Sequence, residues 1–302
     1  MDSLLSVCDI KEDVKYILDL ASKIKAGEVE DRPLEGKTLA MIFQKSSTIT
    51  RVSFDVGMYQ LGGRAIFLSS NDLQMGRGEP ISDTAKVLSR FVDGIMIRAI
   101  EHEDVIELAK YSDVPVISGL TNLEHPCQAL ADMLTIKEHF GDWEGKKICF
   151  VGDGNNVCNS LLLIAPLLGM DMSVACPKGY EPNDDILKTA LKFADENNTQ
   201  ITVSDDIGIA LENVDVVYTD VWVSMGDEAE AKKREIDLAP FQVNKDLMSL
   251  ANEEAIFMHC LPAIRGQEVT ADVIDGEQSV IYDEAENRMH AQKAVLYYYM
   301  KD

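Results

Sequence analysis

Short apolar runs alternate along the chain with longer segments in which apolar residues recur at helical spacing. The runs cover residues 38–43, 64–68, 94–97, 114–117, 147–151, 171–175, 200–203, 214–218 and 255–258. The intervals between them can hold crossover helices, and a nearly continuous apolar run is typical of a strand buried on both faces. The pattern therefore predicts an α/β protein with parallel β-sheets flanked by helices.

Helical periodicity is clear near both ends of the chain. Apolar residues recur every three or four positions across residues 14–24, and Gly27 follows as a stop signal. Asp9 and Glu12 have the spacing of a capping box, which predicts that they open this helix. The final segment, residues 284–300, is also expected to be helical.

The turn-rich residues 141–145 divide the strand pattern into two sets. A chain of 302 residues also exceeds the usual length of one domain, about 100 to 200 residues. We therefore expect two domains, residues 1–140 and residues 141–283, bridged by the helix that follows His125.

The charge balance is strongly acidic, with 28 Lys and Arg residues against 52 Asp and Glu residues and a formal net charge of −24. Such a chain repels nucleic acid and anionic membrane surfaces, so neither is an expected partner. An anionic substrate would need a compact local cluster of basic side chains and backbone N–H groups.

The cysteines and the N-terminus indicate a cytoplasmic protein. The six cysteines include no Cys-x-x-Cys pair, which fits a reducing compartment. The first ten residues carry acidic rather than basic side chains, and no stretch of about 18 apolar residues occurs. A secretory signal and a membrane span are therefore not expected.

Residues 43–51 are the first candidate for chemistry, because they follow a predicted strand and open a predicted helix. The hydroxyls of Ser47, Thr48 and Thr50 and the free N–H groups of a helix N-terminus favour an anion, with Lys45 and Arg51 beside them. Phosphate is the natural ligand of such a site. The alternative is that the hydroxyls serve only as helix caps.

Three further residues suit a small carbonyl compound. Arg98 ends a predicted strand, where ligands of open α/β sheets gather. His125 can donate a hydrogen bond to a carbonyl oxygen, and Gln128 can both accept from and donate to a carbamoyl group. Taken singly, the arginine could be a boundary residue and the histidine a structural cap.

The second half carries two candidates, each just after a predicted strand. Asp220 is followed by the small-residue loop 223–226, which could hold a cationic amine and close over it. Cys260 could be a nucleophile, a polarisable contact or part of the core. An ordinary loop with one exposed carboxylate is the alternative for Asp220.

A dinucleotide site is the rival hypothesis at the turn after residues 147–151. Gly152 and Gly154 match the start of the Gly-x-Gly-x-x-Gly fingerprint, but Val157 stands at the third glycine. Residues 174–177 also lack the acidic side chain that would bind a ribose. We therefore rank a dinucleotide-dependent oxidoreductase below a small-molecule enzyme.

Taken together, these segments resemble the aspartate/ornithine carbamoyltransferase family over essentially the whole chain, and its ornithine-specific members most closely. The matching motifs are Lys45-Ser-Ser-Thr-Ile-Thr-Arg51, His125-Pro-Cys-Gln128, Asp220 to Gly226, His259-Cys-Leu-Pro262 and Glu286-Asn-Arg288. The Ser-Met-Gly sequence at 224–226 favours ornithine over the aspartate-using and putrescine-using relatives.

The resemblance implies transfer of the carbamoyl group of carbamoyl phosphate to the δ-amine of L-ornithine, giving L-citrulline and phosphate without a metal or cofactor. The first domain would bind carbamoyl phosphate and the second ornithine, and residues 284–302 would pack back on the first domain. Family members are trimers or multiples of trimers, so a homotrimer or a multiple of it is expected.

The resemblance also implies roles for individual residues. Carbamoyl phosphate would be bound by Ser47, Thr48, Thr50, Gln74, Arg98, His125, Gln128, Cys260, Leu261 and Arg288. Gln74 would reach into a neighbouring subunit. Ornithine would be bound by Asn156, Asp220, Ser224 and Met225. The residues nearest the reacting atoms would be Arg98, His125, Asp220 and Cys260.

The chain departs from the family at Ile49, which occupies the place of the central arginine in the phosphate motif. A charge-assisted hydrogen bond contributes roughly 1.5–3 kcal/mol, so carbamoyl phosphate should bind about tenfold to a hundredfold more weakly unless Lys45, Arg77 or a neighbouring subunit compensates. An inactive relative, or one with altered specificity, is the resulting alternative. The retained His125, Gln128, Asp220 and Cys260 argue against an inactive relative, which would have little reason to keep all four side chains.

Overall fold

The computed structural model describes residues 2–69, 73, 78–223 and 228–301, and the chain forms two compact units. Unit 1 comprises Met1–Leu134 and Glu286–Asp302, and unit 2 comprises Thr135–Ala285. Each unit contains one wholly parallel sheet with helices on its faces. The predicted fold class is therefore confirmed.

The sheet of unit 1 has four strands in the order β2-β1-β3-β4. They are β1 (Thr38–Phe43), β2 (Arg64–Ser69), β3 (Gly94–Arg98) and β4 (Val116–Leu120). All residues of β1 and β4 are buried, as the apolar runs predicted, whereas the edge strand β2 has half-buried and exposed side chains.

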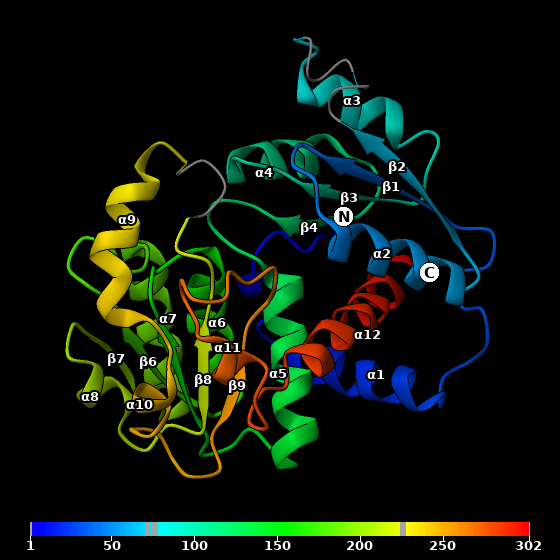
Figure 1. Ribbon diagram of the computed structural model, residues 1–302. Helices are drawn as coiled ribbons and strands as arrows, with labels where there is room; N and C mark the ends of the chain where they lie inside the picture. Colours follow the sequence, from blue (N-terminus) through cyan, green and yellow to red (C-terminus); the bar gives the residue numbers. More distant parts are fainter. Residues whose placement is uncertain (1, 70–72, 74–77, 224–227, 302) are drawn as a thin grey trace. The chain divides into compact units, whose positions relative to one another are not determined.

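Helices cover both faces of this sheet because the direction of strand addition reverses. The chain passes from β1 to β2 through α2 (Thr48–Gln60), returns to β3 through α3 (Ile81–Leu88), and reaches β4 through α4 (His102–Tyr111). Because crossovers are right-handed, a connection to a strand on one side and a connection to a strand on the other side lie on opposite faces of the sheet. Accordingly, α3 and α4 lie on one face of the sheet and α2 on the other (Figure 1).

The N-terminal segment differs from the prediction at its capping box. Ser6, not Asp9, is the cap: Ser6 and Asp9 form a capping box around the short 3₁₀ helix η1 (Val7–Ile10). The Asp9 carboxylate accepts hydrogen bonds from the backbone of Leu5 and Ser6, each at 2.8 Å, so it cannot also open the next helix. That helix, α1 (Val14–Ala26), ends at Gly27 in the left-handed conformation, as predicted.

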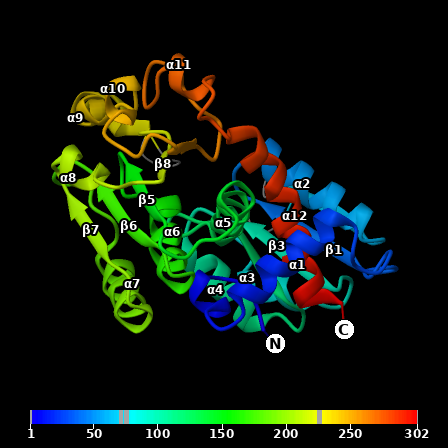
Figure 2. The ribbon, with the colours of Figure 1, turned by 90° about the horizontal axis from the view of Figure 1, so that it is seen from below.

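The sheet of unit 2 has five strands in the order β7-β6-β5-β8-β9. They are β5 (Lys147–Val151), β6 (Asp171–Ala175), β7 (Ile201–Ser204), β8 (Val216–Thr219) and β9 (Ile256–Met258). Figure 2 shows β7, β6 and β5 running side by side in this order. The first and last residues of each of these strands differ by at most two positions from those of a predicted apolar run.

The helices of unit 2 bury both faces of its sheet. They are α6 (Asn156–Leu167), α7 (Asp184–Asn197), α8 (Ile207–Leu211), η3 (Glu228–Glu230), α9 (Ala231–Leu238), η4 (Ala239–Phe241), α10 (Lys245–Met248) and α11 (Ala271–Ile274). One face packs against residues of α8, α10 and α11 in a continuous apolar core. All residues of α6 except the first are buried. This packing anchors the helix and thereby fixes the turn that precedes it.

Two long helices contain the unit boundaries, α5 (Pro126–Phe140) and α12 (Ile281–Met300). The C-terminal part of α12 packs on unit 1, as expected. Lys25 Nζ of α1 donates to Asn287 Oδ1 at 2.8 Å, and Lys293 Nζ donates to Gln60 Oε1 of α2 at 2.9 Å. Within the described ranges, no helix has the length and apolar character needed to cross a bilayer.

Candidate active site

Each sheet has one point at which the direction of strand addition reverses. In unit 1 the neighbours β1 and β3 lead in opposite directions, to β2 and β4, and in unit 2 β5 and β8 do the same. Ligands of open parallel sheets bind beyond the carboxyl ends of such strands. The predicted site residues follow these strands or lie beside them.

The segment after β1 forms the N-terminus of α2, as predicted. Ser47 is the N-cap, and its hydroxyl accepts a hydrogen bond from Thr50 N at 3.2 Å. Thr48 is exposed at the start of the helix. Because first-turn N–H groups have no partner within a helix, the cap leaves donors for an anion. Capping and anion binding are therefore compatible here.

The Thr50 hydroxyl is a meeting point for two arginines. Arg98 Nη1 lies 3.4 Å and Arg288 Nη2 3.3 Å from Thr50 Oγ1, and Ser47 Oγ lies 3.1 Å from the same atom. Thr50 and Arg288 are 1% and 3% exposed. Two guanidinium groups on one neutral oxygen concentrate positive charge beside a helix N-terminus, which favours a phosphate or carboxylate ligand.

His125 lies directly before α5 and is buried. Burial lowers the pKa of its imidazole well below the usual 6.5, and the positive charges of Arg288 and Arg98 lower it further. The ring is therefore neutral near pH 7. A neutral imidazole can donate one hydrogen bond to a carbonyl oxygen without adding a positive charge to those of Arg98 and Arg288.

Gln128 is held in one orientation by its two neighbours. Its Oε1 accepts a hydrogen bond from Arg288 Nη1 at 2.6 Å, and its Nε2 donates to Asp132 Oδ1 at 2.8 Å. Because a guanidinium only donates and an ionised carboxylate only accepts, both contacts select the same orientation of the amide. We call the set Ser47, Thr50, Arg98, His125, Gln128 and Arg288 the anion cluster.

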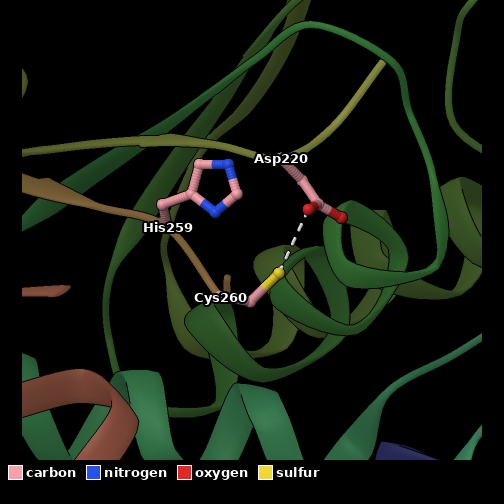
Figure 3. Close-up of side chains that lie close together, drawn as sticks. All are labelled: Asp220, His259 and Cys260. Atoms are coloured by element: carbon pink, nitrogen blue, oxygen red, sulfur yellow. Dashed lines mark hydrogen bonds between the residues drawn. The ribbon is translucent and has the colours of Figure 1, made fainter. Parts of the chain in front are cut away.

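In unit 2, Asp220 directly follows β8 and is 9% exposed. Its Oδ2 accepts from Asn155 Nδ2 at 2.7 Å, and its Oδ1 accepts from Cys260 Sγ at 3.1 Å (Figure 3). Asn155 is also the N-cap of α6, with its side-chain oxygen bonded to Val157 N and Cys158 N. We call Asn155, Asp220 and Cys260 the carboxylate cluster, which suits a cationic amine.

The backbone around Cys260 is held by buried carboxylates. Leu261 N donates to His259 Nδ1 at 2.9 Å, so the ring proton lies on Nε2, which donates to Glu268 Oε1 at 3.1 Å. Glu284 accepts hydrogen bonds from His259 N at 2.9 Å and from the Tyr218 hydroxyl at 3.0 Å. These contacts fix the main chain on both sides of the thiol.

The ligand atoms of Asp220, His259 and Cys260 lie within 4.8 Å of one another, the kind of group that can hold a metal ion. These atoms already make hydrogen bonds: the thiol donates to the carboxylate, and both ring nitrogens of His259 have partners. A metal ion would have to displace some of these bonds and the thiol proton.

The turn at Gly152 and Gly154 does not support the dinucleotide hypothesis. A Cβ atom at Gly154 would lie 2.4 Å from Pro182 N and 2.6 Å from Glu181 C. This glycine is therefore required by the close approach of the protein's own backbone. The sequence shows the same Gly-x-Gly for either cause, so only the structure separates them.

The structure brings together most of the predicted residues within each unit. In unit 2, Asn156, predicted to bind ornithine, is the first residue of α6 and half-buried, and its neighbour Asn155 supplies the amide bonded to Asp220. An Asn immediately before a predicted helix is a typical cap, and that signal could have identified Asn155. Three other predicted residues, Gln74, Ser224 and Met225, lie outside the described residues.

The fold and these clusters define a two-domain α/β protein with one polar site suited to an anion and another suited to an amine. Two family models together match nearly the whole chain: the carbamoyl-P binding domain of aspartate/ornithine carbamoyltransferase matches residues 3–138, and the Asp/Orn binding domain matches residues 144–299. The chain belongs to the aspartate/ornithine carbamoyltransferase family.

Individual relatives point to the ornithine branch of the family. The chain is 77% identical to the ornithine carbamoyltransferase of Methanobrevibacter smithii over 301 residues, which is 100% of both chains. It is 62% identical to that of Methanothermobacter thermautotrophicus, again over the whole of both chains. The solved ornithine carbamoyltransferase of Pyrococcus furiosus superposes with a TM-score of 0.94 at 53% identity, covering 99% of this chain and 96% of the other.

Proposed function

We propose that this chain transfers the carbamoyl group of carbamoyl phosphate to the δ-amine of L-ornithine, giving L-citrulline and phosphate. The observation that carries the proposal is the pair of clusters with opposite electrostatic character, in a chain 77% identical to an ornithine carbamoyltransferase. The anion cluster suits the doubly charged acyl phosphate, and the carboxylate cluster suits an ammonium group.

In this proposal the anion cluster binds and polarises carbamoyl phosphate. Ser47, Thr48 and the first-turn N–H groups of α2 bind the phosphate, and Arg98 binds a phosphate oxygen and the carbonyl oxygen. Neutral His125 donates a hydrogen bond to the carbonyl oxygen. Gln128, fixed by Arg288, accepts a hydrogen bond from the carbamoyl NH₂ with the remaining lone pair of Oε1.

The carboxylate cluster orients the acceptor amine. Asp220 binds the side-chain ammonium of ornithine. Asn155 and Cys260 donate hydrogen bonds to the Asp220 carboxylate and so set the direction of its two oxygens. Once the δ-amine has lost a proton, its lone pair attacks the carbonyl carbon. The bond from that carbon to the phosphate oxygen then breaks with its electron pair going to the departing phosphate, and the nitrogen passes a second proton to that phosphate or to water. Donors already positioned around the carbonyl oxygen stabilise its developing negative charge.

A citrulline assay with carbamoyl phosphate and ornithine tests the proposal directly. Citrulline should form with ornithine and not with aspartate or putrescine as the acceptor. Asp220→Asn should lower kcat/KM for ornithine by roughly tenfold to a hundredfold, the loss of one charge-assisted hydrogen bond. Asp205→Asn is the matched control, because that carboxylate is exposed and pairs with the exposed Lys178.

The two alternatives give different outcomes in the same assay. An inactive relative would form no citrulline at saturating substrates, and a relative with altered specificity would carbamoylate another amine. A crystal structure with a bisubstrate analogue, carrying a phosphonate and an ornithine end, provides a second test. Contact of the analogue with only one of the two clusters would contradict the proposed transfer.

We also propose that the protein assembles as a homotrimer or a multiple of it. Exposed apolar side chains on α2 and the edge strand β2 support this assembly: Val52, Val56, Tyr59, Ile66 and Phe67. Edge strands with apolar side chains are open to association with another chain. Light scattering after size exclusion should give three times the 33.5 kDa mass of the chain or a multiple of that value, and a monomer at micromolar concentration would contradict the proposal.

We infer a reducing, cytoplasmic compartment for this enzyme. The inference is supported by the six cysteines, all of which carry free thiols. Cysteine-rich secreted domains use their cysteines in disulfides instead. Fractionation of the source cells, followed by detection of the protein, tests the location.

A further inference from the structure

A buried ion pair lies next to the carboxylate cluster and involves residues that the proposed reaction does not use. Arg234 of α9 donates from Nη1 to Asp153 Oδ2 at 2.7 Å and to the carbonyl oxygen of Trp222 at 3.2 Å. The side chains of Arg234 and Asp153 are 12% and 13% exposed. Both are therefore largely withdrawn from water, where an ion pair does little to stabilise a fold.

The contacts of Arg234 with Asp153 and Trp222 join the two segments that carry Asn155 and Asp220. Asp153 lies in the turn after β5, two residues before Asn155, and Trp222 lies two residues after Asp220. Asn155 and Asp220 are themselves joined at 2.7 Å. Arg234 thus connects the same two segments a second time, and the two connections close a ring around the end of the sheet.

The surroundings of the ring limit how it can relax. The turn is held by Gly154 N, which donates to the carbonyl oxygen of Tyr180 at 2.8 Å, and by the close contact of Gly154 with residues 181–182. The Tyr180 ring also lies 5.4 Å from the Arg234 guanidinium carbon. The Arg234 guanidinium thus has two oxygen acceptors, lies near an aromatic ring and has Glu230 Oε2 3.9 Å from its Nε, contacts that together define one position for it.

We propose that Arg234 is a positioning residue for the amine acceptor, acting through Asp153 and the Trp222 carbonyl to set the distance between Asn155 and Asp220. This inference rests on the proposed function. Asp153 has a second effect, because it neutralises a guanidinium that would otherwise repel an ammonium group near Asp220. Both hydrogen bonds come from Nη1, whose two N–H bonds are fixed in the guanidinium plane and so hold the two acceptors in a set geometry, whereas a lysine ammonium is a point charge that can rotate.

Steady-state kinetics of Arg234→Lys, Arg234→Gln and Asp153→Asn test the inference. We expect KM for ornithine to rise about tenfold to a hundredfold in all three, the range for a small misplacement of a substrate-binding group. KM for carbamoyl phosphate should stay within about twofold, because the anion cluster lies in the other unit. Lys232→Gln is the control, since Lys232 lies on the same helix and is exposed.

The double variant Arg234→Gln/Asp153→Asn separates positioning from charge. If the two residues act as one unit, its KM for ornithine should be no higher than that of the worse single variant. An unchanged KM for ornithine in Arg234→Lys and Arg234→Gln would overturn the inference. An equal rise of both KM values with a lower Tm would also overturn it, because that is the signature of a general loss of folding.

The failure of the inference differs from the failure of the proposed function. A wild-type enzyme that forms no citrulline refutes the function, whatever the variants do. A wild-type enzyme that forms citrulline, with Arg234 variants indistinguishable from Lys232→Gln, refutes only the positioning role.

Discussion

At the scale of single residues, two arginines supply the positive charge of the anion cluster beside Thr50. Arg98 and Arg288 both contact the Thr50 hydroxyl. Arg51, from the same motif, instead stacks on the Phe67 ring, with its guanidinium carbon 3.8 Å from the ring centroid. Ile49 is half-buried in the first turn of α2 and supplies no charge.

Replacing Ile49 with arginine should therefore strengthen the binding of carbamoyl phosphate. An added charge-assisted hydrogen bond corresponds to roughly 1.5–3 kcal/mol, or about a tenfold to hundredfold lower KM for carbamoyl phosphate. Initial rates at saturating ornithine measure the effect, and Ile49→Leu, which adds no charge, is the control. Equal KM values in Ile49→Arg and wild type would show that another cation already compensates.

His125 gives a prediction about stability and pH. Its pKa in the folded protein is lowered below the usual 6.5, so below that pH the unfolded chain takes up a proton that the folded protein refuses. The contribution of His125 to stability is complete above pH 6.5 and is lost as the pH falls toward the folded pKa. The loss is at most about 1.4 kcal/mol per pH unit.

Urea unfolding of wild type and His125→Gln between pH 5 and 8 should reveal this linkage. Below about pH 6.5, the free energy of unfolding should fall less steeply in His125→Gln than in wild type, since one titrating group has been removed. The exposed His139 offers the control variant His139→Gln, which removes an imidazole outside the anion cluster. Parallel pH profiles for His125→Gln and wild type would contradict the assignment.

At the scale of elements, the periodicity of the sequence predicted the strands and the C-terminal helix, because burial on two faces leaves a continuous apolar run. Helix starts were less predictable. Asp9 has the spacing of a cap for α1, yet the Ser6 hydroxyl three residues earlier uses Asp9 for its own capping box. Two capping motifs overlap here, and tertiary contacts decide which of them forms. The Glu124 carboxylate accepts hydrogen bonds from the Ser6 hydroxyl and from Val7 N, which stabilises the cap at Ser6.

The site residues show the same division. Ser47, Thr50 and Arg98 could be proposed because they carry distinctive chemistry at strand ends, whereas Arg288, in α12, was implied only by the family resemblance. Asn155 and Asn156 are chemically equal, and only the first turn of α6 decides which amide reaches Asp220. Glu268 and Arg234 could not be predicted, because their partners His259 and Asp153 are set by tertiary packing and not by a local motif.

The turn between β5 and α6 gives a prediction at this scale. In Gly154→Ala the new methyl would collide with the backbone of residues 181–182, at 2.4 Å from Pro182 N. The turn must shift, which should lower the free energy of unfolding by about 1–3 kcal/mol and move Asn155 away from Asp220. KM for ornithine should rise and KM for carbamoyl phosphate should not.

A second glycine provides the comparison for this variant. In Gly57→Ala the new methyl would meet only the side chains of Lys293 and Leu296, at 3.2 and 3.9 Å. Alanine also has the higher helix propensity, so the change in stability should be under about 1 kcal/mol. Thermal unfolding measures both variants, and equal Tm values would contradict a rigid contact at Gly154.

At the scale of the whole molecule, the net charge of −24 has opposite consequences for the two proposed substrates. Ornithine is a cation near neutral pH and carbamoyl phosphate is an anion. The global field therefore attracts ornithine and repels carbamoyl phosphate until the latter comes within reach of Arg98 and Arg288. Salt screens the long-range field more strongly than contacts shorter than the Debye length, which is about 10 Å at 0.1 M.

Raising the ionic strength from about 0.01 to 0.3 M should thus move the two specificity constants in opposite directions. We expect kcat/KM for ornithine to fall several-fold as the attraction is screened, and kcat/KM for carbamoyl phosphate to rise or stay level because screening removes repulsion more than local attraction. A neutral osmolyte at matched osmolarity controls for water activity, and a second salt controls for specific anion competition. A parallel fall of both constants in both salts would show that the local clusters, and not the net charge, govern how this protein meets its substrates.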